Sequence, residues 1–165
     1  MAKKKVAKTR SLTKSKKRTK SKKAVQEALI ANMKAWQKIE NQSVATTGRV
    51  MEVTENPIVR LVMEIIQRDS QMHYRVQEWI ADSLSGKPVT LTPDEIGAVW
   101  GLVEEHIKVE QKTIDLAKEA IELIGGSKTM QVQSYLLEYL LEDEEKHDKL
   151  LERLEAIQKG MYPYG

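Results

Sequence analysis

Apolar residues recur every three or four positions through most of this chain, a spacing that places them on one face of a helix. The pattern predicts four helices, at about residues 21–44, 57–84, 93–124 and 128–159, with a weaker continuation of the first to residue 51. Turn signals separate them: Asn56-Pro57, the segment SGKPVTLTPDE and the pair Gly125-Gly126. Four long helices with short connections predict an all-α fold, an antiparallel four-helix bundle.

The third helix has the clearest start signal. Thr92, Pro93 and Glu95 have the spacing of a capping box, in which Thr and Glu side chains satisfy each other's backbone N–H groups. Gly125 suits the left-handed geometry that ends many helices. We therefore expect one continuous helix from Pro93 to Ile124.

Ionisable side chains interrupt the apolar stripe of three helices. Glu144 and His147 fall on the stripe of the fourth, Glu110 on that of the third, and Asp69 and His73 on that of the second. A buried carboxylate is costly unless it is paired, protonated or bound to a cation. The remaining stripe positions are Val25, Leu29, Met33, Trp36 and Ile39 or Glu40; Val62, Ile66, Val76 and Ile80; Val103, Ile107, Ile114, Ala117, Ile121 and Ile124; and Val132, Leu136, Leu140, Leu151 and Leu154.

The spacing of Glu144 and His147 points to metal binding. Glu-x-x-His places a carboxylate and an imidazole on one side of a helix, about one turn apart. Helical bundles present such a pair to one metal ion. We expect the side chains of Asp69, His73, Glu110, Glu144 and His147 to meet at one height in the bundle.

The second and fourth helices also resemble each other. When His73 is set over His147 without gaps, Asp69 falls on Asp143 and Ile66 on Leu140. The bundle is therefore predicted to consist of two related hairpins.

The second predicted hairpin resembles that of a known family. A carboxylate on one helix, a Gly turn, then DEEKH at residues 143–147 followed by KLLERL resembles the helical hairpin of the rubrerythrin and ferritin-like group. In that group each hairpin supplies one Glu and then a Glu-x-x-His, and two hairpins hold two iron or manganese ions. For the second hairpin the resemblance implies that Glu110, Glu144 and His147 are ligands.

The first hairpin departs from this pattern. His73 matches, but Ser70 stands where the second Glu is expected. Gapless extension puts the single-Glu position near Trp36, with Gln37 beside it and Glu40 one turn away.

The metal content stays open at this stage. Glu110, Glu144, His147 and His73, with Asp69 and His106 in reserve, suffice for one Fe²⁺, Mn²⁺ or Zn²⁺ ion. A dinuclear iron or manganese site needs bridging carboxylates, and Ser70 removes one unless Asp69 replaces it. A single-ion site, a dinuclear site and a bundle without metal all remain. With no Cys in the chain, a Cys-ligated centre, a zinc knuckle and a disulfide framework are excluded.

Charge divides the chain into an N-terminal arm and an acidic body. Residues 1–23 contain 12 Lys or Arg and no acid, whereas the rest of the chain has a net charge of −9. A basic arm of this composition, disordered by itself, is typical of DNA- or RNA-binding tails; a solubilising tail is the alternative. Its basic residues are Lys3, Lys4, Lys5, Lys8, Arg10, Lys14, Lys16, Lys17, Arg18, Lys20, Lys22 and Lys23.

These observations predict a tail at 1–23, a bundle at 24–160 and a short extension at 161–165. The first function class is a ferritin-like iron or manganese protein, held on nucleic acid by its tail and handling iron or peroxide. The second is a DNA- or ribosome-associated bundle that has lost its metal site. The third is a scaffold whose tail contacts an acidic protein.

The expected cellular location follows from two signals that the sequence lacks, a membrane span and a secretory signal. No apolar run approaches the roughly 20 residues that span a bilayer, and no apolar stretch follows the basic N-terminus as in a secretory signal. We expect a cytoplasmic protein associated with the nucleoid, chromatin or the ribosome. Catalytic residues are not identifiable, and the oligomeric state, a homo-oligomer included, stays open.

Overall fold

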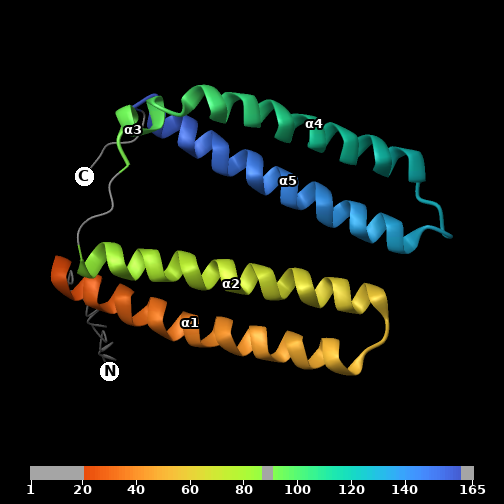
Figure 1. Cartoon of the computed structure of the whole chain (residues 1–165), viewed down its shortest axis with the longest axis horizontal. Coiled ribbons are helices and arrows are strands. Elements are labelled where there is room, and N and C mark those ends of the chain that lie inside the picture. Colours follow the sequence, from red (N-terminus) through yellow and green to blue (C-terminus); the bar gives the residue numbers. More distant parts are fainter. Residues whose placement is uncertain (1–20, 87–90, 161–165) are drawn as a thin grey trace, which may run out of the picture. The chain divides into compact units, whose positions relative to one another are not determined.

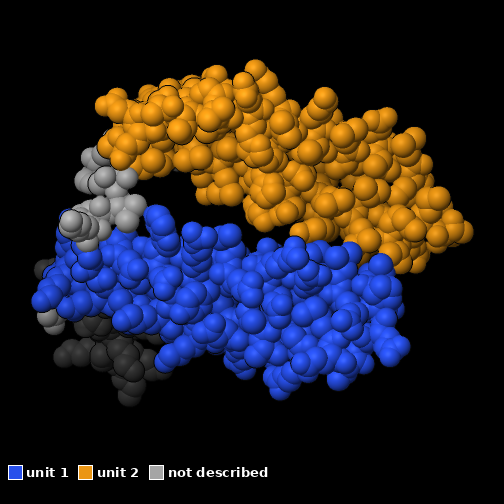
Figure 2. Space-filling model, in the orientation of Figure 1, with its two compact units in different colours: residues 1–88 blue, residues 89–165 orange. Residues whose placement is uncertain are grey.

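The computed structural model describes residues 21–86 and 91–160, and all regular elements in them are α-helices (Figure 1). The chain divides into two compact units, residues 1–88 and 89–165 (Figure 2). The predicted all-α class is confirmed. No helix within the described ranges is long and apolar enough to cross a membrane. The helices are α1 (Lys22–Val53) and α2 (Pro57–Ser85) in the first unit, and α3 (Pro93–Gly97), α4 (Trp100–Ile124) and α5 (Gln131–Gln158) in the second.

The first unit is a hairpin in which α1 packs along α2. Ser21 caps α1 by accepting a hydrogen bond from the backbone N–H of Ala24 at 3.2 Å. Asn56 caps α2 by accepting from the N–H groups of Ile58 and Val59, and Pro57 occupies the first turn as expected.

The end of α1 differs from the prediction. The helix continues to Val53, beyond both residue 44 and residue 51. Thr47, which weakened the sequence pattern, donates its hydroxyl hydrogen bond back to the Ser43 carbonyl at 2.8 Å and lies buried in the hairpin. Packing against α2 therefore outweighs the low helix propensity of this segment.

The interface between α1 and α2 is unusually polar. Its buried residues are Met33, Glu40 and Thr47 on α1 and Ser70, Gln77 and Ala81 on α2. Of the two alternatives in the first stripe, Glu40 is buried and Ile39 is 60% exposed. The seam that α2 presents to α1 is displaced from its predicted apolar stripe, because Ile66, Val76 and Ile80 of that stripe are exposed in the hairpin. One residue turns a helix by about 100°, so a seam displaced by a single position presents different side chains.

In the second unit the predicted continuous third helix is wrong. The Thr92–Glu95 capping box is present, but α3 ends at Gly97 and α4 begins at Trp100. Val99 between them has φ −117° and ψ 2°, outside helical geometry. Gly97 and Gly101 flank this β-branched residue, and all three have low helix propensity.

The α4–α5 hairpin follows the sequence more closely. Glu110, Ile114 and Ala117 of the predicted stripe are buried on α4. Gly125 ends the helix with φ +54°, the left-handed cap that its sequence position predicts. On α5, Val132 and Leu140 of the predicted stripe are 45% and 46% exposed, so neither is buried within the α4–α5 hairpin.

Candidate metal centre

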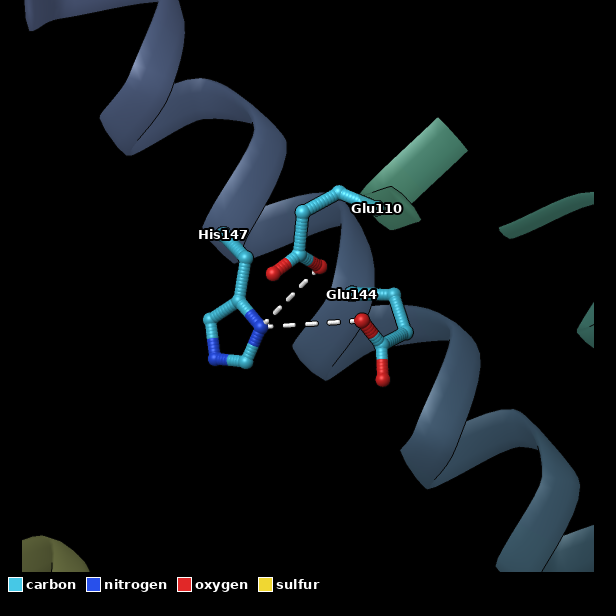
Figure 3. Close-up of side chains that lie close together, drawn as sticks. All are labelled: Glu110, Glu144 and His147. Carbon is cyan, nitrogen blue, oxygen red and sulfur yellow. Dashed lines mark ion pairs between the residues drawn. The ribbon is translucent and has the colours of Figure 1, made fainter. Parts of the chain in front are cut away.

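Glu110 of α4 and Glu144 and His147 of α5 point toward one another across the second hairpin (Figure 3). One potential ligand atom from each lies within 4.8 Å of those from the other two. His147 Nδ1 is 3.5 Å from Glu110 Oε2 and 3.6 Å from Glu144 Oε2. The i, i+3 spacing on α5 places the last two side chains together, and hairpin pairing adds Glu110.

These separations match those between ligands of a bound ion. With bonds of about 2.1 Å to nitrogen and oxygen, two ligands in a tetrahedral site lie about 3.4 Å apart. A neutral N–H···O hydrogen bond is shorter, typically about 2.9 Å between its heavy atoms. Glu110 Oε2 is buried and has no hydrogen-bond partner among the described residues. The residues present therefore fit a divalent cation.

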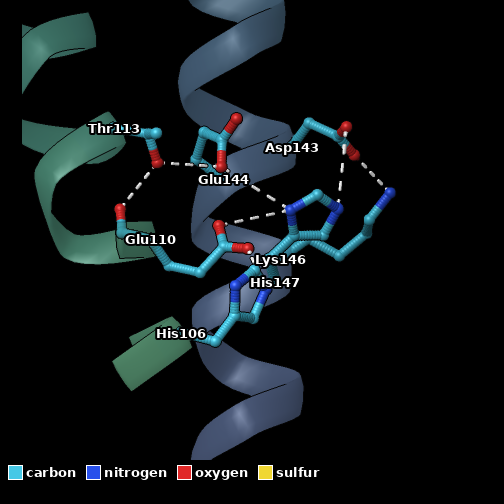
Figure 4. A network of polar contacts seen from close by, with 7 residues as sticks. All are labelled: His106, Glu110, Thr113, Asp143, Glu144, Lys146 and His147. Carbon is cyan, nitrogen blue, oxygen red and sulfur yellow. Dashed lines mark hydrogen bonds and ion pairs between the residues drawn. The ribbon is translucent and has the colours of Figure 1, made fainter. Parts of the chain in front are cut away.

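Further side chains hold the cluster in place (Figure 4). The Thr113 hydroxyl lies 3.0 Å from Glu144 Oε2 and 2.7 Å from the backbone oxygen of Glu110, and it donates to one of these acceptors at a time. His106 Nε2 lies 2.9 Å from Glu110 Oε1. Both carboxylates are thus oriented by a neighbouring group.

His147 has a carboxylate neighbour of its own. Asp143 Oδ2 lies 3.9 Å from His147 Nε2, on the side of the ring away from the two glutamates, and Asp143 also pairs with Lys146. In metal sites, a hydrogen bond from the outer nitrogen of the imidazole to a carboxylate leaves the other nitrogen free to coordinate; the present distance of 3.9 Å is longer than such a bond. The other nitrogen here is Nδ1, which faces Glu110 and Glu144.

The charge of the cluster and its accessibility from solvent are both consistent with a bound cation. Two carboxylates meet one imidazole, so the cluster lacks positive charge unless a histidine is protonated or a cation enters. Glu110 is buried, whereas the His147 side chain is 40% exposed. A shallow depression of about 250 Å³ opens beside it, lined by His106, Glu110, His147, Leu150 and Leu151. Small ions can therefore reach the site from solvent.

The two candidate ligands from the second helix lie in the other unit. His73 contacts Glu40 there, with 3.5 Å between Nδ1 and Oε1. Asp69 is exposed on α2, and the neighbouring position that faces α1 is Ser70. A ligand set that joins these residues to Glu110, Glu144 and His147 stays a prediction.

Sequence reasoning missed one supporting residue, Thr113. Thr113 follows Glu110 by three positions, and this i, i+3 spacing is the signal that could have identified it. His106, held in reserve, contacts Glu110 from the preceding turn. In the first hairpin the buried carboxylate that contacts α2 is Glu40, one helical turn after the position near Trp36.

Most of the basic arm, residues 1–20, lies outside the described residues, as does the predicted extension at 161–165. Lys22 and Lys23 are the exception, because they form the first turn of α1, where Lys23 pairs with Glu27 at 3.9 Å. Helix α1 therefore begins within the predicted tail.

No protein-family model matches this chain, and neither does any curated protein or any solved structure.

Proposed function

We propose that this chain is a ferritin-like metal protein that holds iron or manganese through Glu110, Glu144 and His147 and is attached to nucleic acid by its basic arm. The observation that carries the metal assignment is the convergence of three ligand atoms within 4.8 Å. The four-helix bundle in which two such hairpins pair is part of the proposal.

The donor set favours Fe²⁺ or Mn²⁺. Carboxylate oxygens suit Mn²⁺, and imidazole suits iron and zinc, so two carboxylates with one imidazole suit ions of intermediate hardness. Three protein ligands also leave coordination positions for water or a small substrate, as in catalytic metal sites. A bound iron or manganese ion would supply one-electron chemistry toward O₂ or peroxide.

The protein's own groups prepare the site for that ion. Thr113 orients Glu144, His106 orients Glu110, and Asp143 lies beside the outer nitrogen of His147. Such outer contacts typically change metal affinity by about 10- to 100-fold when they are removed.

Nucleic-acid attachment is supported by charge. Residues 1–23 contain 12 basic side chains, and the rest of the chain is acidic. Lys and Arg that neutralise phosphates release counterions, which gives strong binding at low salt without sequence preference. The body, with a net charge of −9, would be repelled by phosphate.

The test measures metal on purified protein. The full chain and the double variant Glu144→Gln, His147→Ala are loaded with Mn²⁺ or anaerobic Fe²⁺, desalted and assayed by elemental mass spectrometry. The parent should retain about one ion in this site and the double variant none. Glu142→Gln, which removes an exposed carboxylate from the same helix, is the matched control and should behave as the parent. Equal retention by parent and double variant would refute the metal assignment.

One contact favours a second function, a nucleic-acid-binding helical protein without metal chemistry. His106 Nε2 already pairs with Glu110 Oε1 at 2.9 Å, and a protonated His106 would neutralise part of the cluster without an ion. In that case metal would not raise the melting temperature, and the double variant would be at least as stable as the parent, because it removes crowded charge.

A further inference from the structure

The hairpin of α1 and α2 leaves an outer stripe of α2 exposed. This outer stripe is the one that the sequence predicts, with residues spaced by four, three, four, three and four: Val62, Ile66, Asp69, His73, Val76 and Ile80. Ile66, Val76 and Ile80 are 40%, 51% and 37% exposed, and the His73 side chain is 60% exposed. Because α1 packs against a neighbouring seam of α2, the outer stripe is available to another helix.

The outer stripe is symmetric about the level of residue 71. Asp69 and His73 lie two residues before and after that level. The positions five and nine residues away on either side are all apolar: Ile66, Val76, Val62 and Ile80. Two such stripes that run antiparallel therefore bring apolar residues against apolar ones and Asp69 against His73. The outer stripe is thus complementary to a second copy of itself, as a two-fold interface requires.

Charge favours this pairing at its centre. His73 presents Nδ1 to Glu40 Oε1 at 3.5 Å within the hairpin, which leaves Nε2 on the other side of the exposed ring for a second carboxylate. Asp69 is exposed and forms no ion pair with the described residues. An imidazolium between two carboxylates makes charge-assisted contacts on both sides. A two-fold dimer would contain this arrangement twice.

Helix α1 widens the apolar surface beside the outer stripe. Trp36 lies one turn before Glu40, whose carboxylate contacts His73, and Trp36 is 50% exposed. Ile39, next to Glu40, is 60% exposed. The surface is therefore wider than one helix, as expected of a specific interface, which buries about 800 Å² on each partner.

The second hairpin of the same chain matches the outer stripe less well. Only residues 86–92 link α2 to α3, and such a link reaches at most about 28 Å, less than the roughly 43 Å of a 29-residue helix. Because α3 packs with α4 and α5, this link allows α5 to lie along α2 only in the parallel direction. Parallel pairing sets equivalent positions side by side and brings Asp69 against Asp143, a like-charge contact.

Net charge favours self-association of the first hairpin over that of the second. Residues 24–88 contain seven Lys or Arg and eight Asp or Glu, whereas residues 89–165 contain eight and sixteen. Helix α5 has a related order of residues in Leu140, Asp143, His147 and Leu150, but its pairing would join two strongly acidic hairpins. Two copies of the first hairpin meet with little repulsion.

We propose that the outer stripe of α2 is the interface of a symmetric homodimer, in which α2 runs antiparallel to α2 of a second copy and Asp69 of each chain pairs with His73 of the other. The inference deepens the bundle part of the proposed function, because it identifies two copies of the first hairpin as the hairpins that pair. It makes Asp69 and His73 interface residues and not ligands shared with the second hairpin.

Sedimentation velocity of the full chain, stripped of metal with a chelator, tests the dimer. Ile66→Lys and Val76→Glu each place an unpaired charge at two points of the interface and should raise the Kd of the dimer at least about tenfold. Asp69→Lys, which sets a cation against His73, should do the same. Gln71→Lys, on the opposite side of α2, is the matched control and should change the Kd less than about twofold. Circular dichroism checks that each variant keeps its helicity.

A mixture of two variants tests the antiparallel direction. In equal amounts, the Ile66→Lys and Val76→Glu chains should form a heterodimer at least about tenfold tighter than either homodimer, because the new cation of one chain faces the new carboxylate of the other. In a parallel dimer the two new charges would lie ten positions apart along the interface, and mixing would restore nothing.

The outcomes are distinguishable from those of the metal assignment. A parent that stays monomeric up to about 100 μM, as it would if its own second hairpin covered the outer stripe, overturns the inference. A Kd that Ile66→Lys and Val76→Glu leave unchanged, or a loss that mixing does not restore, overturns it as well. Metal retention is measured separately: a dimer that retains no ion supports the inference while the metal assignment fails, and a monomer that retains one does the reverse.

Discussion

Glu110 on α4 and His147 on α5 face each other with 3.5 Å between Oε2 and Nδ1, although a helix end, a turn and half of the next helix separate them in the chain. The carboxylate oxygen in this pair is buried and has no hydrogen bond from the described residues. Glu144 approaches the same nitrogen at 3.6 Å. Two carboxylates therefore meet one imidazole in this cluster, an arrangement whose negative charge an added cation would balance.

Metal should stabilise the folded chain through this pair. A ligand that binds only the native state at 100 times its Kd adds about 2.7 kcal/mol to the free energy of unfolding. The melting temperature of the parent should rise on adding Mn²⁺ at such an excess, and that of Glu110→Gln should not. Glu105→Gln, an exposed neighbour on α4, serves as the control and should keep the full rise. A rise in Glu110→Gln equal to that of the parent would rule out this ligand.

Thr113→Val should weaken metal binding without unfolding the hairpin. The hydroxyl that orients Glu144 is lost while the side-chain volume is nearly kept, and we expect a drop in Mn²⁺ affinity of about tenfold. Thr46→Val is the matched control, because its hydroxyl contacts only carbonyls of its own helix. Isothermal titration of both variants measures the difference, and similar affinities would show that Thr113 has no positioning role.

Replacing Gly101, within α4, and Gly125, at its end, by alanine should change the free energy of unfolding in opposite directions. Gly125 has φ +54°, so Gly125→Ala should lower the free energy of unfolding by about 1 to 2 kcal/mol. At Gly101, within the helix, an added Cβ meets nothing within 4 Å, so Gly101→Ala should raise it by about 0.5 to 1 kcal/mol. Urea unfolding followed by circular dichroism gives both values. Changes of the same sign would contradict the cap geometry.

The capping box of α3 should make stability depend on pH. The hydrogen bond from the Thr92 backbone N–H, and then that from its hydroxyl, lower the pKa of Glu95 below its ordinary value of 4.5. A carboxyl group whose pKa is lowered on folding stabilises the folded state. This stabilisation is fully present at pH values above the pKa of the unfolded state, and it is lost as the pH falls through the pKa of the folded state. At pH 7 the melting temperature of the parent should therefore be higher than that of Glu95→Gln. This difference in melting temperature should disappear at acid pH. A gap independent of pH would argue against the carboxylate's role.

The basic arm should supply nearly all affinity for nucleic acid. With about half of its charges on phosphates, the logarithm of the binding constant should fall with the logarithm of salt at a slope of about −5 on duplex DNA. Two unrelated duplexes should bind alike. Deleting residues 1–20 keeps Ser21 as the cap of α1 and should abolish binding without loss of helicity or metal.

A structured RNA of equal length is the third ligand in that titration. Strong preference for it would favour ribosome association over DNA attachment. Undiminished binding by the shortened chain would contradict the assignment to the arm.

The sequence by itself determined the all-α class, several helix ends and the three residues at the core of the candidate site, but not the break between α3 and α4. Caps such as Asn56, Thr92 and Gly125 act through bonds to residues a few positions away, so their effect can be predicted locally. The same holds for Glu144 and His147, whose i, i+3 spacing fixes their proximity on any helix. Glu110 could be assigned to the same site from the sequence because a short turn joins its helix to the helix of Glu144 and His147.

The tertiary structure decided which faces of α1 and α2 meet and that Glu40 is the carboxylate buried between them. Glu40 and Ser70 are closer in the chain than Glu110 and Glu144 are, mainly because the connection between α4 and α5 is longer than that between α1 and α2. A gapless comparison therefore placed the first Glu one helical turn too early, near Trp36. Turn length and the rotation of one helix against another depend on packing between distant segments, and a stripe of apolar residues is too broad to specify either.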